Sequence, residues 1–218
     1  MQAAAAGGAA VAGTERALRT LLVNVNGLSS VAKRRRLFAS LLTDSYDVAV
    51  LVETHCVGPD EAAAWAREGA GPGRPWPGAA RWAHGSGAAR GVGVLLGEHL
   101  DLSDLATDYS DDGGRVLRVG WRDAPMGHDW AVVAAYAPNT DSEQQAFFSP
   151  SGPLWAALSA GTAGARVLLA GDFNCVLHPA DSSALRAAAQ PATRGASALR
   201  RLLLHFGLTD LWTHTQTI

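Results

Sequence analysis

Three segments of the sequence place carboxylate and amide side chains directly after a short apolar run. Their polar ends are Asn24-Val25-Asn26-Gly27, Glu53-Thr54-His55 and Gly171-Asp172-Phe173-Asn174. Carboxylate oxygens are ligands that Mg²⁺ prefers, and amide groups can bind phosphate oxygens without adding negative charge. Together these residue types indicate a site that handles phosphate with the help of a hard cation.

Strands are predicted before each polar end, at the short apolar runs Thr20–Val25, Val48–Val52 and Arg166–Ala170, and the last of these is expected to be buried. A strand fixes the backbone, while a polar side chain at its end stays accessible, which is where functional groups often lie. Gly171 would also allow another group to approach the backbone closely. We therefore expect the three polar ends to belong to one site.

Periodicity and turn-forming residues predict the other elements. Strands are expected at Gly91–Leu96, Arg115–Trp121 and Trp130–Tyr136. Helices are expected at Val31–Leu42, Pro59–Glu68, Ser142–Leu158 with a break at Pro150–Pro153, and Ala196–Phe206. The Gly-, Pro- and Trp-rich segment Gly69–Gly87 is expected to be a loop.

Tyr136-Ala137-Pro138-Asn139 completes a recognisable order of motifs with Asn24 to Leu28, Glu53 to His55 and Gly171 to Asn174. Their order and approximate spacing resemble the endonuclease/exonuclease/phosphatase (DNase I-like) superfamily. Within it, the sequence is most similar to the apurinic-type endonuclease domain of LINE-type (non-LTR) retrotransposons. The resemblance extends over residues 18–214, nearly the whole chain.

The resemblance implies an α/β fold, a four-layer αββα sandwich of two packed mixed sheets flanked by helices. It implies Mg²⁺-dependent hydrolysis of a phosphodiester in DNA, which leaves a nick, with Mn²⁺ as a second candidate cofactor. The implied partners are DNA and the reverse transcriptase part of a longer polyprotein. We weigh two alternatives, a catalytically dead retroelement remnant and a phosphomonoesterase or phospholipid phosphodiesterase on the same fold.

By resemblance, Glu53 would bind Mg²⁺, helped by Asn24 directly or through water. Tyr136 and Asn174 would donate hydrogen bonds to the scissile phosphate. Asp172 would position, or exchange a proton with, either the attacking water or the leaving 3′ oxygen. The residues expected to contact DNA or phosphate are Asn26, His55, Lys33, Arg34, Arg35 and Arg36.

Each of these residues also has an ordinary structural interpretation. Asn24 could cap a turn, Glu53 could pair with an arginine, and Tyr136 could be a core aromatic residue. Asp172 and Asn174 could form a turn, His55 could be packed without a role, and a run of basic residues on a helix is most often a solvated face. The functional interpretation is favoured because these residues occur together and in the family's order.

Members of this family carry a Ser-Asp-His triplet, whose histidine acts with an aspartate to activate water. The sequence departs from the family because it lacks this triplet. Neither His205, on a predicted helix, nor His214, near the last residue, is expected to replace it. General acid–base catalysis contributes a factor of about 10² to 10⁴. We therefore expect the chain to be incomplete at its C-terminus, to expose sheet edges, and to be weakly active or inactive. Val52, where many relatives have Gln, is expected to matter little.

Composition sets broader limits. The 218 residues, 48% hydrophobic with a net charge of −2, fit one large domain and give no global nucleic-acid signature. We expect residues 1–17 to be a flexible Ala/Gly-rich leader and residues 18–218 to form the endonuclease/exonuclease/phosphatase domain. With no signal peptide or transmembrane segment predicted, the expected location is intracellular, nuclear or cytoplasmic, with Cys56 and Cys175 as reduced thiols. The oligomeric state is left open.

Overall fold

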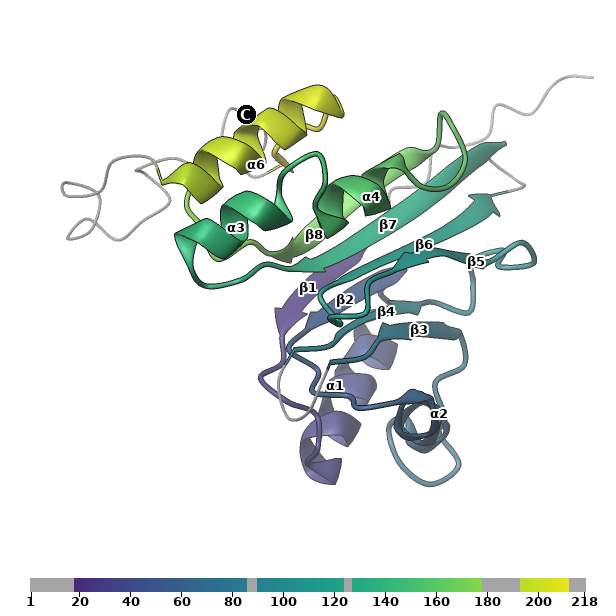
Figure 1. Ribbon diagram of the computed structural model, residues 1–218. Coiled ribbons are helices and arrows are strands. Elements are labelled where there is room, and N and C mark those ends of the chain that lie inside the picture. The colour runs from purple at the N-terminus through teal and green to yellow at the C-terminus, as the bar shows by residue number, and fades with distance from the viewer. Residues whose placement is uncertain (1–17, 86–89, 124–126, 178–192, 212–218) are drawn as a thin grey trace, which may run out of the picture.

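The computed structural model describes residues 18–85, 90–123, 127–177 and 193–211. The predicted leader, residues 1–17, and His214 lie outside these described residues. The described chain forms two four-stranded mixed β-sheets with helices on their outer faces (Figure 1).

The first sheet has the strand order β1-β2-β4-β3. Its members are β1 (Thr20–Asn24), β2 (Val48–Val52), β4 (Val92–Leu96) and β3 (Ala79–Ala83). β1 runs parallel to β2, whereas β4 is antiparallel to both β2 and β3. Every residue of β2 and β4 is buried, which explains why their sequences are continuous apolar runs rather than alternating patterns.

The prediction of a loop across Gly69–Gly87 was wrong in part, because β3 (Ala79–Ala83) lies within it. Only Ala83 of this strand is fully buried, so β3 lacks the apolar signal of an interior strand. Trp82 supports the register of β3 on β4, because its ring lies over Gly93, its partner residue on β4. A Cβ added at Gly93 would come within 2.5 Å of this ring. The strand is therefore fixed by a tertiary contact that local sequence does not reveal.

The second sheet has the order β5-β6-β7-β8. Its members are β5 (Ala106–Ser110), β6 (Val116–Asp123), β7 (His128–Tyr136) and β8 (Arg166–Asp172). β7 and β8 are parallel and the other pairs are antiparallel. β5, which the sequence did not predict, is a mostly exposed edge strand with an irregular register on β6.

Helices cover the two outer faces, so the layers follow the order helices, sheet, sheet, helices (Figure 1). The first sheet is covered by α1 (Val31–Asp44) and α2 (Pro59–Glu68). The second is covered by α3 (Asp141–Phe147), α4 (Pro153–Ser159) and α6 (Arg194–His205). The expected four-layer αββα sandwich is confirmed for the described residues.

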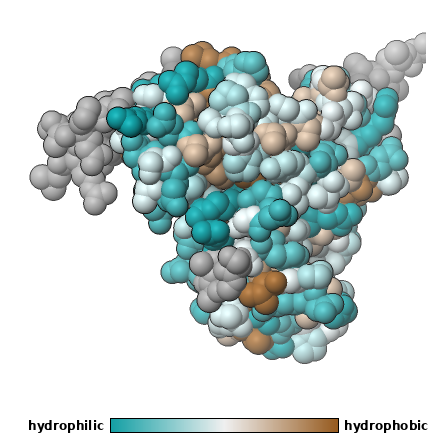
Figure 2. All heavy atoms as spheres, in the orientation of Figure 1, coloured by the Kyte–Doolittle hydropathy of each residue, from teal (hydrophilic) through white to brown (hydrophobic). Residues whose placement is uncertain are grey.

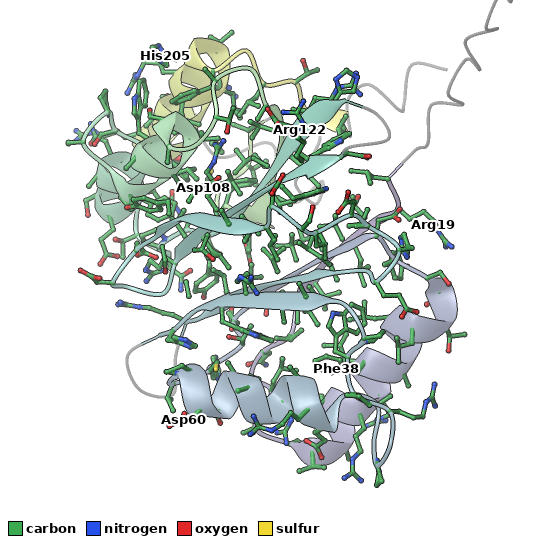
Figure 3. The ribbon with its side chains drawn as sticks, turned by 90° about the vertical axis from the view of Figure 1, so that its right-hand side faces the viewer. Arg19, Phe38, Asp60, Asp108, Arg122 and His205 are labelled. Carbon is green, nitrogen blue, oxygen red and sulfur yellow. The ribbon has the colours of Figure 1, made fainter. Side chains whose placement is uncertain are left out.

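Three hydrophobic clusters hold the layers together. One lies between the sheets and includes Val50, Val94 and Leu117. A second joins the second sheet to its helices, and a third joins the first sheet to α1 and α2. In the third cluster Phe38 is fully buried and projects from α1 toward the first sheet (Figure 3). Burying a side chain of this size stabilises the fold by about 1.5–3 kcal/mol.

The large exposed hydrophobic residues among the described ones come from several different elements, and hydrophobic atoms are scattered over the visible face (Figure 2). These residues are Leu22, Val31, Val57, Val176, Leu204 and Leu211. In the described part of the chain, no helix has both the length and the apolar character needed to cross a membrane.

The two parallel pairs, β1–β2 and β7–β8, determine where the polar motifs meet. Asn24 lies opposite Val52 at the end of the first pair, directly before Glu53. Tyr136 lies opposite Asp172 at the end of the second pair. Gly171 lets β7 and β8 approach each other, because a Cβ at this position would come within 2.0 Å of the Ala135 carbonyl oxygen. The polar ends of all four strands therefore face the same end of the sandwich.

Candidate active site

Asn24 joins the two sheets through its side-chain amide. Its Nδ2 donates to Glu53 Oε1 at 2.8 Å and to Asp172 Oδ2 at 3.2 Å. Glu53 follows β2 in the first sheet, and Asp172 ends β8 in the second. The contact brings together three of the predicted site residues from segments far apart in the sequence.

The orientation of the Asn24 amide is fixed by the backbone. Its Oδ1 accepts a hydrogen bond from the Asn26 N–H at 3.0 Å, so the NH₂ group must face the carboxylates. Asn24 therefore separates two negative charges with a neutral donor. In this arrangement Oδ1 uses one lone pair for the Asn26 N–H and keeps the other for a ligand.

Left-handed backbone conformations are concentrated in the same place. Asn26, Glu53, His55 and Asn174 have φ values of 40°, 56°, 58° and 49°. Among the described residues only two other non-glycine residues, Ser45 and Arg90, have positive φ. Such conformations are strained for residues with a Cβ and are found preferentially at functional sites. At these positions the backbone turns sharply after a strand, and this turn directs the polar side chains into the site.

Asp172 and Asn174 are linked to the neighbouring Tyr136 segment. Asp172 Oδ1 accepts from the Asn174 N–H at 3.1 Å, and the Ala137 N–H donates to the Asp172 carbonyl at 2.8 Å. Asn174 Nδ2 donates to the Ala137 carbonyl at 2.8 Å. An amide nitrogen has two hydrogens, so Asn174 keeps a second donor for a ligand.

Tyr136 lies beside Glu53. Burial, followed by a hydrogen bond to the Glu53 carboxylate and by its charge, raises the pKa of the Tyr136 hydroxyl. Raising the pKa keeps the hydroxyl protonated, so it remains a hydrogen-bond donor at neutral and mildly alkaline pH.

Two further predicted residues border the site. His55 Nε2 lies 4.0 Å from Glu53 Oε2, and its ring rests against Gly27, where an added Cβ would be 2.8 Å from Nδ1. Lys33 Nζ donates to the Asn26 carbonyl at 3.0 Å. The half-buried His55 and Lys33 thus support the backbone around Asn26 and Glu53, and Asn26 itself is exposed.

The predicted basic run, residues 33–36, is divided by the structure. Arg34 is buried and cannot serve as a DNA contact, because its guanidinium donates to the carbonyls of Leu28 and Ser29 and to Glu68. Arg35 also pairs with Glu68, at 3.0 Å, but stays largely exposed. Two arginines beside Glu68 lower the pKa of that carboxyl group, with the hydrogen bond from Arg34 as the largest cause. Arg36 is exposed.

The sequence analysis missed Arg115, which lies next to the predicted site. Its Nη1 donates to the Tyr136 carbonyl at 3.1 Å, and its guanidinium lies 5.3 Å from the centre of the Tyr136 ring. Burial, and then the charge of Arg90, lower the pKa of Arg115. The sequence predicted Arg115 as the first residue of a strand, whereas β6 begins one residue later, at Val116, and the sequence position gives no sign of this contact.

The comparisons with known proteins support this fold. No protein family model matches the sequence. The AP endonuclease of Leishmania major superposes with a TM-score of 0.59 at 18% identity, over 86% of this chain and 65% of that one. An AP endonuclease from Archaeoglobus fulgidus gives 0.57 at 16% identity, over 87% and 71% of the two chains. The chain has the DNase I-like fold.

A 3′–5′ exonuclease from Neisseria meningitidis has a similar fold, with a TM-score of 0.54 at 23% identity. The superposition covers 88% of this chain and 71% of that one. In sequence, this chain is 27% identical over 196 residues to an uncharacterized 149 kDa protein of transposon TX1 from Xenopus laevis. This alignment covers 90% of the chain but only 14% of the transposon protein. The chain thus spans a small part of that relative.

A depression of about 600 Å³ opens beside the Asn24–Asp172 contact of this DNase I-like chain. Its lining combines the polar side chains of Asn24, Asp172 and Asn174 with the exposed hydrophobic residues Leu22 and Val176. The full lining is Leu22, Asn24, Val52, Gly171, Asp172, Phe173, Asn174, Cys175 and Val176. A ligand can therefore reach Asp172 and Asn174 from solvent.

The donor set fits Mg²⁺. Glu53 and Asp172 offer carboxylate oxygens around one amide, and Mg²⁺ is usually held by one or two carboxylates while it keeps several waters. In the part of the chain that the structure describes, no three His, Cys, Asp or Glu side chains form a cluster suited to a metal ion.

Proposed function

We propose that this chain is a Mg²⁺-dependent phosphodiester hydrolase that nicks DNA, of the retrotransposon endonuclease type. The observation that carries the proposal is the Asn24 amide, which holds the Glu53 and Asp172 carboxylates together where two parallel strand pairs end. Similarity to a transposon protein supports the retroelement assignment, and the fold shared with AP endonucleases and an exonuclease supports nuclease chemistry.

The proposed chemistry assigns one role to each polar residue. Glu53 holds the cation, and Asn24 keeps the two carboxylates in place. Tyr136 and Asn174 donate hydrogen bonds to oxygens of the scissile phosphate, where negative charge increases in the transition state. When bound, Mg²⁺ supplies positive charge that offsets the charge of the phosphoryl oxygens.

Asp172 is proposed to accept a proton rather than to donate one. Both of its carboxylate oxygens accept hydrogen bonds from nitrogen donors, Oδ1 from the Asn174 N–H and Oδ2 from Asn24 Nδ2. In that role Asp172 would orient the attacking water and take up its proton.

We further propose that residues 18–218 form the catalytic domain, preceded by residues 1–17, and that exposed Arg36 and Arg35 contact DNA phosphates. The 218 residues contain no Ser-Asp-His triplet. Without that histidine, nicking by this polypeptide is expected to be slower by a factor of about 10² to 10⁴ than with it.

The proposal is tested by nicking of supercoiled plasmid with purified residues 1–218 at high enzyme concentration. Slow nicking is expected in Mg²⁺ or Mn²⁺ and none in chelator. Glu53→Ala should abolish it, whereas Glu98→Ala, which changes an exposed glutamate after β4, should leave it intact. Absence of nicking by the folded protein, or equal nicking by Glu53→Ala, would contradict the proposal. Hydrolysis of phosphomonoesters or lipid headgroups without DNA nicking would instead support another activity on the same fold.

A further inference from the structure

The two segments proposed to bind phosphate are joined by a residue outside every motif. Gln144 lies on α3 and is 3% exposed. Its Nε2 donates to the Pro138 carbonyl at 2.9 Å and to the Asn174 carbonyl at 2.7 Å. Pro138 belongs to the segment after Tyr136, and Asn174 to the segment after Asp172.

Both hydrogens of the Gln144 amide are used in these contacts. A side-chain amide has two N–H donors, and each reaches a different segment. Because Gln144 is buried, loss of its donors would leave the buried Pro138 carbonyl without a partner and would release the Asn174 carbonyl, whose bond to Gln144 is partly buried. The position is thus suited to an amide, which a hydrophobic side chain of similar volume cannot replace.

Neighbouring helices hold Gln144 in position. An added Cβ at Gly195, in the first turn of α6, would come within 2.3 Å of Gln144 Oε1, so only glycine leaves room for the amide. Asp141, one turn earlier on α3, accepts a hydrogen bond from the Gly195 N–H at 2.7 Å. The outer helical layer therefore fixes the amide against the two segments.

From this geometry we propose that Gln144 is a positioning residue for phosphate binding. It sets the separation between Tyr136 and Asn174 through their backbones, without itself touching the substrate. The effect of Gln144 on catalysis rests on the proposed function. The hydrogen-bonded link that Gln144 makes between the two segments does not depend on whether the chain is active.

The structural part is tested by amide hydrogen exchange followed by NMR in Gln144→Met, with Gln145→Met as the matched control. Gln145 neighbours Gln144 on α3 but is exposed. In Gln144→Met, the Ala137 and Asn174 amide protons should exchange about tenfold faster or more, while the β4 amide protons are unchanged. Unchanged exchange at Ala137 and Asn174, or an equal acceleration throughout the protein, would overturn the proposal.

The catalytic part is tested on DNA nicking by the same two variants under conditions where both are folded. Gln144→Met should lower kcat by about 10- to 100-fold, because small displacements of positioned groups are costly. The Mg²⁺ concentration for half-maximal activity should not change, because Glu53 and Asn24 are untouched. A loss explained only by a smaller folded fraction, with kcat per folded molecule unchanged, would contradict a positioning role. If the unaltered chain does not nick DNA, the proposed function fails while the exchange experiment still decides the link.

Discussion

Asp47 and Glu53 lie just outside opposite ends of β2, and each has a histidine beside it. Asp47 is 1% exposed, accepts a hydrogen bond from the Arg19 N–H at 2.5 Å, and pairs with His99. The Glu53 side chain is 23% exposed, shares an amide hydrogen bond with Asn24, and has His55 at 4.0 Å. One carboxylate is enclosed by protein and the other is open to solvent.

The surrounding backbone is hydrogen-bonded to neighbouring segments at both ends, so the contrast lies in the side chains. At the Asp47 end, the Asp47 N–H donates to the Arg19 carbonyl and the Gly97 N–H donates to the Asp47 carbonyl, both at 2.9 Å. Arg19 lies where the described chain enters β1 (Figure 3). At the other end, the Gly27 N–H donates to the Glu53 carbonyl at 2.7 Å, and Glu53 itself adopts a left-handed conformation. The same residue types therefore stabilise the fold at one end and are available for chemistry at the other.

The largest expected difference is in stability. Asp47→Ala should lower the free energy of unfolding by about 3 kcal/mol, because it removes a buried carboxylate and leaves the Arg19 N–H and the His99 ring without their partner. Glu53→Ala should change it by less than about 1 kcal/mol, since this carboxylate is partly solvated. Urea unfolding of both variants measures the difference, and equal losses would remove the contrast between the two ends.

Cys56 extends the comparison, because it follows His55 in sequence but is buried. Burial, as the largest cause, raises the pKa of its thiol from 9.0 to about 11. Since the folded pKa is the higher one, the contribution to stability is complete below pH 9 and is lost as the pH rises through 11. Between these limits the loss is about 2 kcal/mol.

Unfolding free energies at pH 8 and pH 11, in the original chain and in Cys56→Ala, test this expectation. The difference in stability between the two proteins should shrink as the pH rises. Burial also raises the pKa of Cys175 to about 11, so the variant should keep part of the pH dependence. An identical pH profile for the two proteins would show that Cys56 ionises normally.

Asn24→Asp gives the smallest expected change and examines the open end directly. A third carboxylate would face Glu53 and Asp172 and remove both hydrogen bonds that Asn24 donates. The metal-free protein should lose about 1 kcal/mol of stability. Added Mg²⁺ should restore it, with a larger rise in Tm than in the original chain. A Tm that does not respond to Mg²⁺ in either protein would argue against a cation at this position.

The sequence predicted those parts of the fold that depend on continuous apolar runs. β2 and α2 have their predicted bounds, and β8 extends two residues beyond the predicted Ala170 to include Asp172. β3 and β5 were missed because their residues are half-exposed and carry no periodic signal. Strands that contain an apolar run are thus encoded locally, even at a sheet edge as in β1 and β8, whereas β3 and β5 depend on their partners. The prediction that β8 is buried was wrong, because none of its residues is fully buried.

The candidate site was predictable in its composition but not in its geometry. Motif order indicated Asn24, Glu53 and Asp172, yet their contact depends on how two separate sheets pack. Arg34 looked like a surface cation, and its burial depends on the positions of the Leu28 carbonyl and Glu68. Gln144 was missed because a polar residue on a short helix gives no local sign that it binds two distant carbonyls.

The bond between Asn24 and Asp172 has a consequence for the order of events during synthesis. It joins residues 148 positions apart, and such distant contacts form late because a long loop must close first. Asn24 and Glu53 leave the ribosome well before Asp172, and the second sheet must dock before the three side chains meet. A nascent chain would therefore carry half of the site without the other half, and the three side chains would form one site only when the sandwich closes.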